Sequence, residues 1–183
     1  MKRSKLTKEK QLKLIEHFVA GTTARTSSVL VKVNKTTASY YFLRLRELIF
    51  KYETEKEKEI FNGEIEVDES YFGGKRKGKR GRGAKDKIPV FGLLKRGGKV
   101  YVKIINNTTS TTLFGIIKEK VQPDSIVYTD SYRSYNILDV SEFKHFRINH
   151  DEKFAEEKNH INGIENFWNQ AKRHLRKFNG IPK

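Results

Sequence analysis

Residues 62–74 read Asn-Gly-Glu-Ile-Glu-Val-Asp-Glu-Ser-Tyr-Phe-Gly-Gly, and the hydrophobic pattern of the chain changes at this stretch. Ile65 and Val67 alternate with acidic residues, which is the period of a β-strand with one buried face. The two glycines that follow are typical of a loop. We therefore predict that a strand with Asp68 near its end opens the second part of the chain.

Working outward from this strand, the hydrophobic pattern predicts a defined order of elements. They are strands over 89–94 and 99–105, a helix capped by residues 108–112, strands over 125–129 and 143–148, and a helix over 162–177. Three strands in hairpin order, a crossover helix, two more strands and a closing helix is the order used by ribonuclease-H-like domains. The predicted fold class is therefore α/β, with a mixed sheet and flanking helices.

The preceding residues, 8–50, have apolar positions at helical spacing. They predict a helix closed near Gly21, a short helix, a turn at Val33-Asn34 and a longer helix, which is the order of a helix-turn-helix. The apolar positions are Leu12, Leu14, Ile15, Phe18 and Val19 in the first helix and Tyr41, Phe42, Leu45, Leu48 and Ile49 in the last. The alternative is a plain three-helix packing unit. We expect a helix-turn-helix region over 1–52, a linker over 53–61 and the α/β domain over 62–183.

The charge balance indicates a polyanionic partner. The chain has 38 Lys and Arg against 22 Asp and Glu, a net charge of +16, and neutralising phosphates with such side chains releases counterions from DNA. We expect double-stranded DNA to be bound by side chains at the start of the last N-terminal helix, and by a basic, glycine-rich loop. These residues are Lys35, Thr36 and Thr37 in the helix, and Lys75, Arg76, Lys77, Lys79, Arg80 and Arg82 in the loop.

The sequence has no long apolar run and no Cys, and these two absences exclude further classes of function. No apolar run approaches the roughly 20 residues that a bilayer span needs, so no membrane partner is expected. The sequence has no Cys, which excludes disulfides, thiol catalysis and Cys-ligated zinc. The composition fits a cytoplasmic protein, and DNA binding would place it at the bacterial nucleoid.

Three acidic residues fall at chemically significant positions. Asp68 lies near the end of the first predicted strand, Asp130 follows the fourth, and Glu165 lies in the closing helix. In this topology the first and fourth strands are neighbours and the last helix packs across them, so we expect the three carboxylates to converge. Carboxylate oxygen is the ligand that Mg²⁺ prefers, and two Mg²⁺ ions can stabilise the attacking and leaving oxygens of a phosphodiester displacement. The prediction is a two-metal site in which Mn²⁺ can substitute.

Three stretches around these acids resemble the DDE transposases of bacterial insertion sequences, and in particular the ISXO2-like, or IS1595-family, branch. They are Glu66-Val-Asp-Glu-Ser-Tyr-Phe-Gly-Gly74, Tyr128-Thr-Asp-Ser-Tyr132, and His160-Ile-Asn-Gly-Ile-Glu-Asn-Phe-Trp168 leading to Lys172-Arg173. The 35-residue spacing from Asp130 to Glu165 is also similar to that family. The resemblance covers roughly residues 60–180.

The resemblance implies that Asp68, Asp130 and Glu165 are catalytic and that Lys172, with Arg173, contacts the transposon end. The implied activity is metal-dependent cleavage at terminal inverted repeats and strand transfer into target DNA, by a homo-oligomer. Because part of the family has Asn at the third position, Asn162 and Asn166 are secondary candidates. Many relatives also have a zinc ribbon and a longer C-terminus, so a shortened copy is an expectation.

Two other functions remain open from the sequence. A shortened transposase would bind DNA without cutting it, and a ribonuclease-H-type nuclease would cleave RNA–DNA hybrids. Glu69 is a weaker metal candidate, because adjacent strand residues point to opposite faces. Trp168 is expected to pack its helix onto the sheet, and core packing is also the expectation for Tyr132 and Tyr135.

Overall fold

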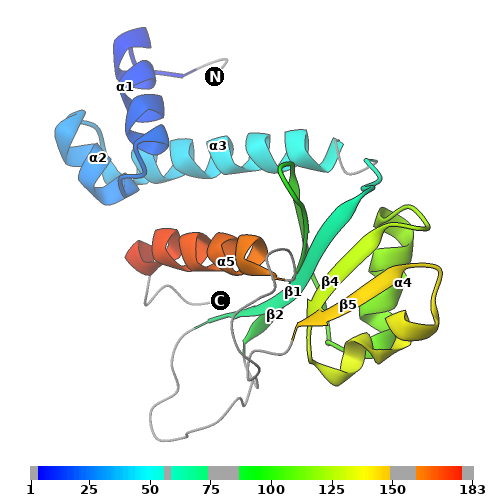
Figure 1. Ribbon diagram of the computed structural model, residues 1–183. Coiled ribbons are helices and arrows are strands. Elements are labelled where there is room, and N and C mark those ends of the chain that lie inside the picture. Colours follow the sequence, from blue (N-terminus) through cyan, green and yellow to red (C-terminus); the bar gives the residue numbers. More distant parts are fainter. Residues whose placement is uncertain (1–3, 56–58, 74–86, 149–159, 179–183) are drawn as a thin grey trace, which may run out of the picture. The chain divides into compact units, whose positions relative to one another are not determined.

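A computed structural model describes residues 4–55, 59–73, 87–148 and 160–178 of this chain (Figure 1). The chain divides into two compact units, Met1–Lys58 and Glu59–Lys183. Each unit has hydrophobic clusters of its own, and each is described separately.

The N-terminal unit consists of three helices, α1 (Lys8–Val19), α2 (Ala24–Leu30) and α3 (Lys35–Glu55). Thr7 and Thr23 cap the first two helices by accepting hydrogen bonds from the backbone N–H groups of Lys10 and Thr26. Lys32, with a φ of 53°, makes the left-handed turn before α3. The three predicted helices and the turn between the last two are therefore present.

The core of this unit includes only some of the apolar positions that have helical spacing. It contains Leu14, Val31, Ala38, Tyr41 and Phe42. Five of the apolar positions at helical spacing are exposed, namely Leu12, Ile15, Val19, Leu48 and Ile49. Because only one side of a single helix turn can face a partner helix in so small a unit, helical spacing overestimates the number of buried positions. Helix α3 also continues to Glu55, into the stretch expected to be a linker or helix end.

The C-terminal unit is an α/β structure built on a five-stranded mixed sheet. Its elements are β1 (Glu64–Phe72), β2 (Ile88–Lys95), β3 (Val100–Ile104), α4 (Ser110–Lys120), β4 (Ile126–Asp130), β5 (Lys144–Ile148) and α5 (Asn162–Leu175), with two 3₁₀ segments at Arg133–Val140 and Arg176–Phe178. The strand order is β3-β2-β1-β4-β5. The β1–β2 and β2–β3 pairs are antiparallel, whereas β4 is parallel to both β1 and β5.

Helices cover both faces of the sheet, with α4 on one side and α5 on the other (Figure 1). Alternation along the strands assigns the side chains to these two layers. Ile65 and Val67 belong to the cluster that contains Leu113 and Ile117 of α4. Phe72 belongs to the opposite cluster, which contains Trp168 of α5. The even-numbered residues of β1, including Asp68, therefore face the α5 side.

The predicted element order agrees with this structure, and the first and fourth strands are indeed neighbours. Two details differ. Asp130 is the last residue of β4 itself, and the 3₁₀ segment Arg133–Val140 was not predicted. The described residues contain no helix that is both long and apolar enough to cross a membrane.

Candidate active site

Asp68 and Asp130 lie on neighbouring parallel strands. The register pairs Glu64 with Ile126 and Glu66 with Tyr128. Continued by two residues, the same register brings Asp68 level with Asp130. Asp68 lies two residues after Glu66, and Asp130 lies two residues after Tyr128, and both of these side chains lie on the α5 side. Because side chains two residues apart in a strand face the same way, both carboxylates face the side of the sheet that α5 covers.

The carboxyl group of Asp68 is in an unusual electrostatic environment. Its pKa is raised from 3.8 to about 7, first by burial and then by the negative charges of Glu69, Asp130 and Glu165. A hydrogen bond from the Glu69 backbone opposes this shift. Burial and like charges both disfavour the ionised form of a carboxyl group, so at neutral pH the protonated and ionised forms of Asp68 are both populated.

Glu165 lies in the first turn of α5. This helix packs on β1 and β2, and its buried residues Ile164 and Trp168 share a cluster with Tyr128 of β4. The negative charge of Glu165 makes the smallest contribution to the raised pKa of Asp68. In the parts of the chain that the structure describes, no three Asp, Glu or His side chains already lie close enough to hold one metal ion.

The chemistry of these donors nevertheless fits a hard divalent cation. Asp68, Asp130 and Glu165 offer carboxylate oxygens, the ligands that Mg²⁺ and Mn²⁺ favour. The accumulated negative charge that raises the pKa of Asp68 would be neutralised by a cation. Perturbed carboxyl groups of this kind gather at functional sites more often than elsewhere.

Hydrogen bonds orient the carboxyl groups of Asp130 and Glu69. Asp130 Oδ1 accepts a hydrogen bond of 2.9 Å from the backbone N–H of Tyr132. On the opposite face, the buried Tyr135 hydroxyl donates to Glu69 Oε2 at 2.7 Å. Glu69 therefore points away from the Asp68 side, as predicted, and Tyr135 is a core residue.

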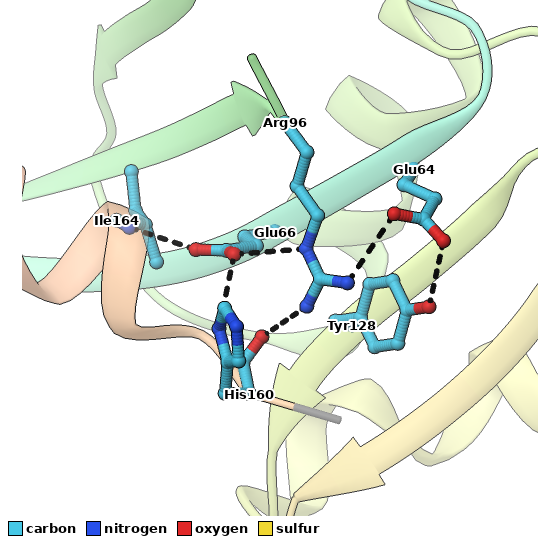
Figure 2. A network of polar contacts seen from close by, with 6 residues as sticks. All are labelled: Glu64, Glu66, Arg96, Tyr128, His160 and Ile164. Carbon is cyan, nitrogen blue, oxygen red and sulfur yellow. Dashed lines mark hydrogen bonds and ion pairs between the residues drawn. The ribbon is translucent and has the colours of Figure 1, made fainter. Parts of the chain in front are cut away.

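The region between β1 and α5 contains a polar network that the sequence analysis did not identify (Figure 2). Glu66, on β1, is 1% exposed. Its Oε2 accepts from the backbone N–H of Ile164 at 2.9 Å, and its Oε1 accepts from Arg96 Nε at 3.0 Å. Nδ1 of His160 lies 3.5 Å from the same Oε1, but without hydrogen-bond geometry in the described structure.

Arg96, which follows β2, connects this carboxylate to two further groups (Figure 2). Its Nη2 donates to the backbone carbonyl of His160 at 2.5 Å, and its Nη1 lies 3.3 Å from Glu64 Oε2. The guanidinium also stacks 3.8 Å from the ring centroid of Tyr128. One feature of the sequence could have indicated Glu66, because it stands two residues before Asp68 on the same face of the strand. Its partner Arg96 is distant in the sequence and could not have been inferred.

The predicted DNA-contacting residues fall in three places. Lys35 and Thr36 are exposed at the start of α3, where Asn34 Oδ1 accepts from the backbone N–H of Thr36, and Thr37 is partly exposed. Lys172 and Arg173 are exposed in the last turn of α5. The six residues of the predicted basic loop, Lys75, Arg76, Lys77, Lys79, Arg80 and Arg82, lie outside the described residues.

Lys172 is positioned over the end of β1. Its Nζ lies 5.9 Å from the ring centroid of Phe72, the last residue of that strand. Lys172 follows Glu165 by two helical turns, so both lie on the same side of α5. The ammonium group is therefore on the acidic face of the sheet. Trp168, between them, is 4% exposed and packs on the sheet as predicted.

The C-terminal unit is thus an α/β domain with Asp68 on β1, Asp130 on β4 and Glu165 on α5. Residues 60–181 match the family described as the ISXO2-like transposase domain. The chain belongs to this transposase family, as the sequence motifs indicated.

Two relatives are similar to parts of the chain. An uncharacterized transposase-like protein of Haemophilus influenzae is 69% identical over 85 residues, which is 46% of this chain and 69% of that protein. An uncharacterized protein in the transposable element ISH50 of Halobacterium salinarum is 30% identical over 139 residues, which is 66% of this chain and 47% of that protein. The second match thus spans about half of the relative's length.

Proposed function

We propose that this chain is a DDE transposase that cleaves DNA at the ends of its insertion sequence and joins them to target DNA. The observation that supports this most directly is that Asp68 and Asp130 lie on the neighbouring parallel strands β1 and β4, on the side of the sheet covered by α5, which contains Glu165. The strand order β3-β2-β1-β4-β5 further supports a ribonuclease-H-like assignment for the C-terminal unit.

In this proposal, Asp68, Asp130 and Glu165 hold divalent metal, Mg²⁺ or Mn²⁺. Transposases of the DDE class generally use such ions, and a bound pair supplies charge stabilisation at the attacking and leaving oxygens of the phosphodiester. Asp68 and Asp130 face the side of the sheet that α5 covers, and α5 contains Glu165. The pKa of Asp68, about 7, means that metal competes with a proton for this carboxylate near neutral pH.

The remaining residues bind and orient DNA. Lys172, exposed and above the end of β1, is suited to contact a phosphate beside the acidic face, and Arg173 extends the same basic helix end. In the N-terminal unit, the first turn of α3 would present Lys35, Thr36 and Thr37 to the terminal repeat, in the manner of a helix-turn-helix recognition helix. Two ends would be brought together by an oligomer.

The deciding experiment uses DNA with the inverted repeats that flank the gene. Wild-type protein is expected to nick this DNA at the repeat end in Mg²⁺ or Mn²⁺ and to transfer the strand. Asp68→Asn is expected to lose at least 100-fold in nicking rate while its DNA affinity stays within about threefold, since removing a metal ligand abolishes the chemistry but not phosphate binding.

Other outcomes would favour a different function. Binding of the repeat DNA without any cleavage by the wild-type protein would indicate a DNA-binding protein. Cleavage of RNA–DNA hybrids in preference to the repeat duplex would indicate a ribonuclease-H-type nuclease.

A further inference from the structure

We propose that Glu66 and Arg96 form a clamp that fixes the start of α5, and with it Glu165, relative to Asp68. Both are positioning residues in this proposal, which rests on the proposed function. The clamp is defined by the bonds of Glu66 to Arg96 and to the backbone of Ile164, and by the bond of Arg96 to the carbonyl of His160.

The first observation is that the Glu66 carboxylate is almost fully buried and that both of its oxygens accept hydrogen bonds. It is 1% exposed, and each oxygen accepts a hydrogen bond, one from Arg96 and one from α5. Burying a carboxylate costs free energy unless it is paired and hydrogen-bonded, and an apolar pair of the same volume often stabilises a fold as well. A buried ion pair at this place is therefore better explained by the precise position that it imposes than by stability alone.

The second observation is the identity of the α5 atom that Glu66 binds. A helix leaves its first N–H groups without intrahelical partners, and Ile161, the residue before α5, has an apolar side chain that cannot cap them. The N–H of Ile164 is one of these groups, and it is satisfied by a carboxylate 98 residues away in the sequence. The negative charge also complements the positive end of the helix dipole.

The third observation is where the two ends of this bond lie in relation to the proposed metal ligands. Ile164 directly precedes Glu165, and Glu66 precedes Asp68 by two residues on the same face of β1. A displacement of the Glu66–Ile164 bond would thus move one ligand relative to the other. Positioning errors of about 1 Å are sufficient to cost two orders of magnitude in rate.

The fourth observation is that two further contacts fix the first turn of α5, next to the bond between Glu66 and Ile164. Arg96 binds the His160 carbonyl just before α5. Gly163 allows the helix to approach the strand, because a Cβ there would lie 2.7 Å from both Glu66 Oε2 and Leu94 Cδ2. The first turn of α5 is therefore fixed by a cation, an anion and a missing side chain together.

The test compares Glu66→Gln and Glu66→Ala with Glu64→Gln. Glu64 is a suitable control because it lies on the same strand and pairs with the same Arg96, but its other contact is Tyr128 and neither partner lies in α5. All variants are full-length, and circular dichroism checks that each is folded. Glu66→Gln conserves the volume, so it remains informative if Glu66→Ala does not fold.

Two readouts are needed, one of them independent of catalysis. In metal-free protein, amide hydrogen exchange of residues 162–166 is expected to rise at least tenfold in Glu66→Ala and less in Glu66→Gln, and Trp168 emission, from the only Trp in the chain, is expected to shift. In the nicking assay, kcat is expected to fall 10- to 100-fold in Glu66→Ala, with partial rescue by Gln, while DNA affinity changes less than threefold. Glu64→Gln should stay within threefold of wild type in every measurement.

The clamp is overturned if exchange in α5 is unchanged in both Glu66 variants, or if Glu64→Gln loosens α5 as much. It is also overturned if α5 loosens but the nicking rate does not fall. If the wild-type protein does not nick DNA at all, the proposed function fails, and the exchange measurement still decides whether Glu66 holds α5.

Discussion

At Asp68, burial and the neighbouring negative charges both disfavour the ionised form of the carboxyl group. Its pKa of about 7 lies well above the usual 3.8, so the folded chain binds a proton more tightly there than the unfolded chain does. The protonated carboxyl contributes stability that is fully present below about pH 4 and is lost as the pH rises through 7. Metal-free protein should therefore lose stability between these pH values.

Asp68→Asn should remove this dependence, because the amide does not ionise. In EDTA at pH 8, the free energy of unfolding of the variant is expected to exceed that of wild type by up to about 4 kcal/mol, at about 1.4 kcal/mol per pKa unit. The difference should vanish below pH 4, and Mg²⁺ should stabilise wild type more than the variant. Denaturant melts from pH 4 to 8 measure both effects, and a variant no more stable than wild type at pH 8 would contradict the origin of the shift.

Two helical glycines give a matched pair of substitutions. Gly163→Ala places a Cβ 2.7 Å from Glu66 Oε2 and from Leu94 Cδ2, so we expect a loss of about 1–3 kcal/mol from overpacking. Gly115→Ala, in α4, meets nothing within 4 Å and should gain up to about 1 kcal/mol from helix propensity. Chemical denaturation followed by circular dichroism distinguishes the two. Equal effects would mean that α5 does not approach β1 as closely as described.

Among the elements, α5 combines the most proposed roles, since it contains Glu165, packs Trp168 on the sheet and presents Lys172 above Phe72. Gly92 of β2 is matched to this helix, because a Cβ at that position would lie 2.5 Å from the Trp168 ring. The helix can therefore pack closely on the sheet because Gly92 and Gly163 have no side chains, and the buried carboxylate of Glu66 orients it.

At the level of this element, Lys172→Ala should weaken DNA binding without changing the fold. One lost phosphate contact is expected to reduce the slope of log K against log salt by about 0.9. Lys118→Ala is the control, because Lys118 is exposed in the last turn of α4, on the other face of the sheet. Fluorescence anisotropy from 50 to 300 mM salt measures both slopes. If the two variants behave alike, Lys172 has no specific position on the DNA.

Across the whole molecule, separate hydrophobic clusters in the two units lead us to expect two unfolding transitions. Phe42→Ala, in the N-terminal cluster, should cost about 3–5 kcal/mol, and Ile117→Ala, in the α4 cluster, about 2–5 kcal/mol. Trp168 is the only Trp and reports on the C-terminal unit alone. Phe42→Ala should therefore lower the Tm seen by circular dichroism in one transition, while the Trp168 transition moves by less than about 2 °C.

Ile117→Ala provides the reciprocal measurement. It should lower the Trp168 transition by several degrees and leave the N-terminal transition in place. A shift of both transitions in both variants would show that the units unfold together.

Much of this architecture could be predicted from short-range pattern. Alternation at Ile65 and Val67 predicts the first strand, and helical spacing over residues 8–50 predicts the N-terminal helices, because strand and helix periods depend on neighbouring residues only. The positions of Asp68, Asp130 and Glu165 within these elements, and the motifs around them, were enough to indicate the transposase family. Burial was less predictable: Leu48 and Ile49 have helical spacing, yet they are exposed.

The sequence pattern could not reveal the interactions between residues that are far apart in the chain. Glu66 looks like any acid in an alternating strand, and Arg96 like any cation beside a turn. The pairing of these two, the bond from Glu66 to an amide 98 residues later, and the pKa of Asp68 all depend on which elements the fold packs together. Hydrogen bonds and desolvation act over a few ångströms in space, so local sequence specifies the strands and helices, whereas the raised pKa of Asp68 and the hydrogen bonds of Glu66 arise once β1, β4 and α5 are assembled.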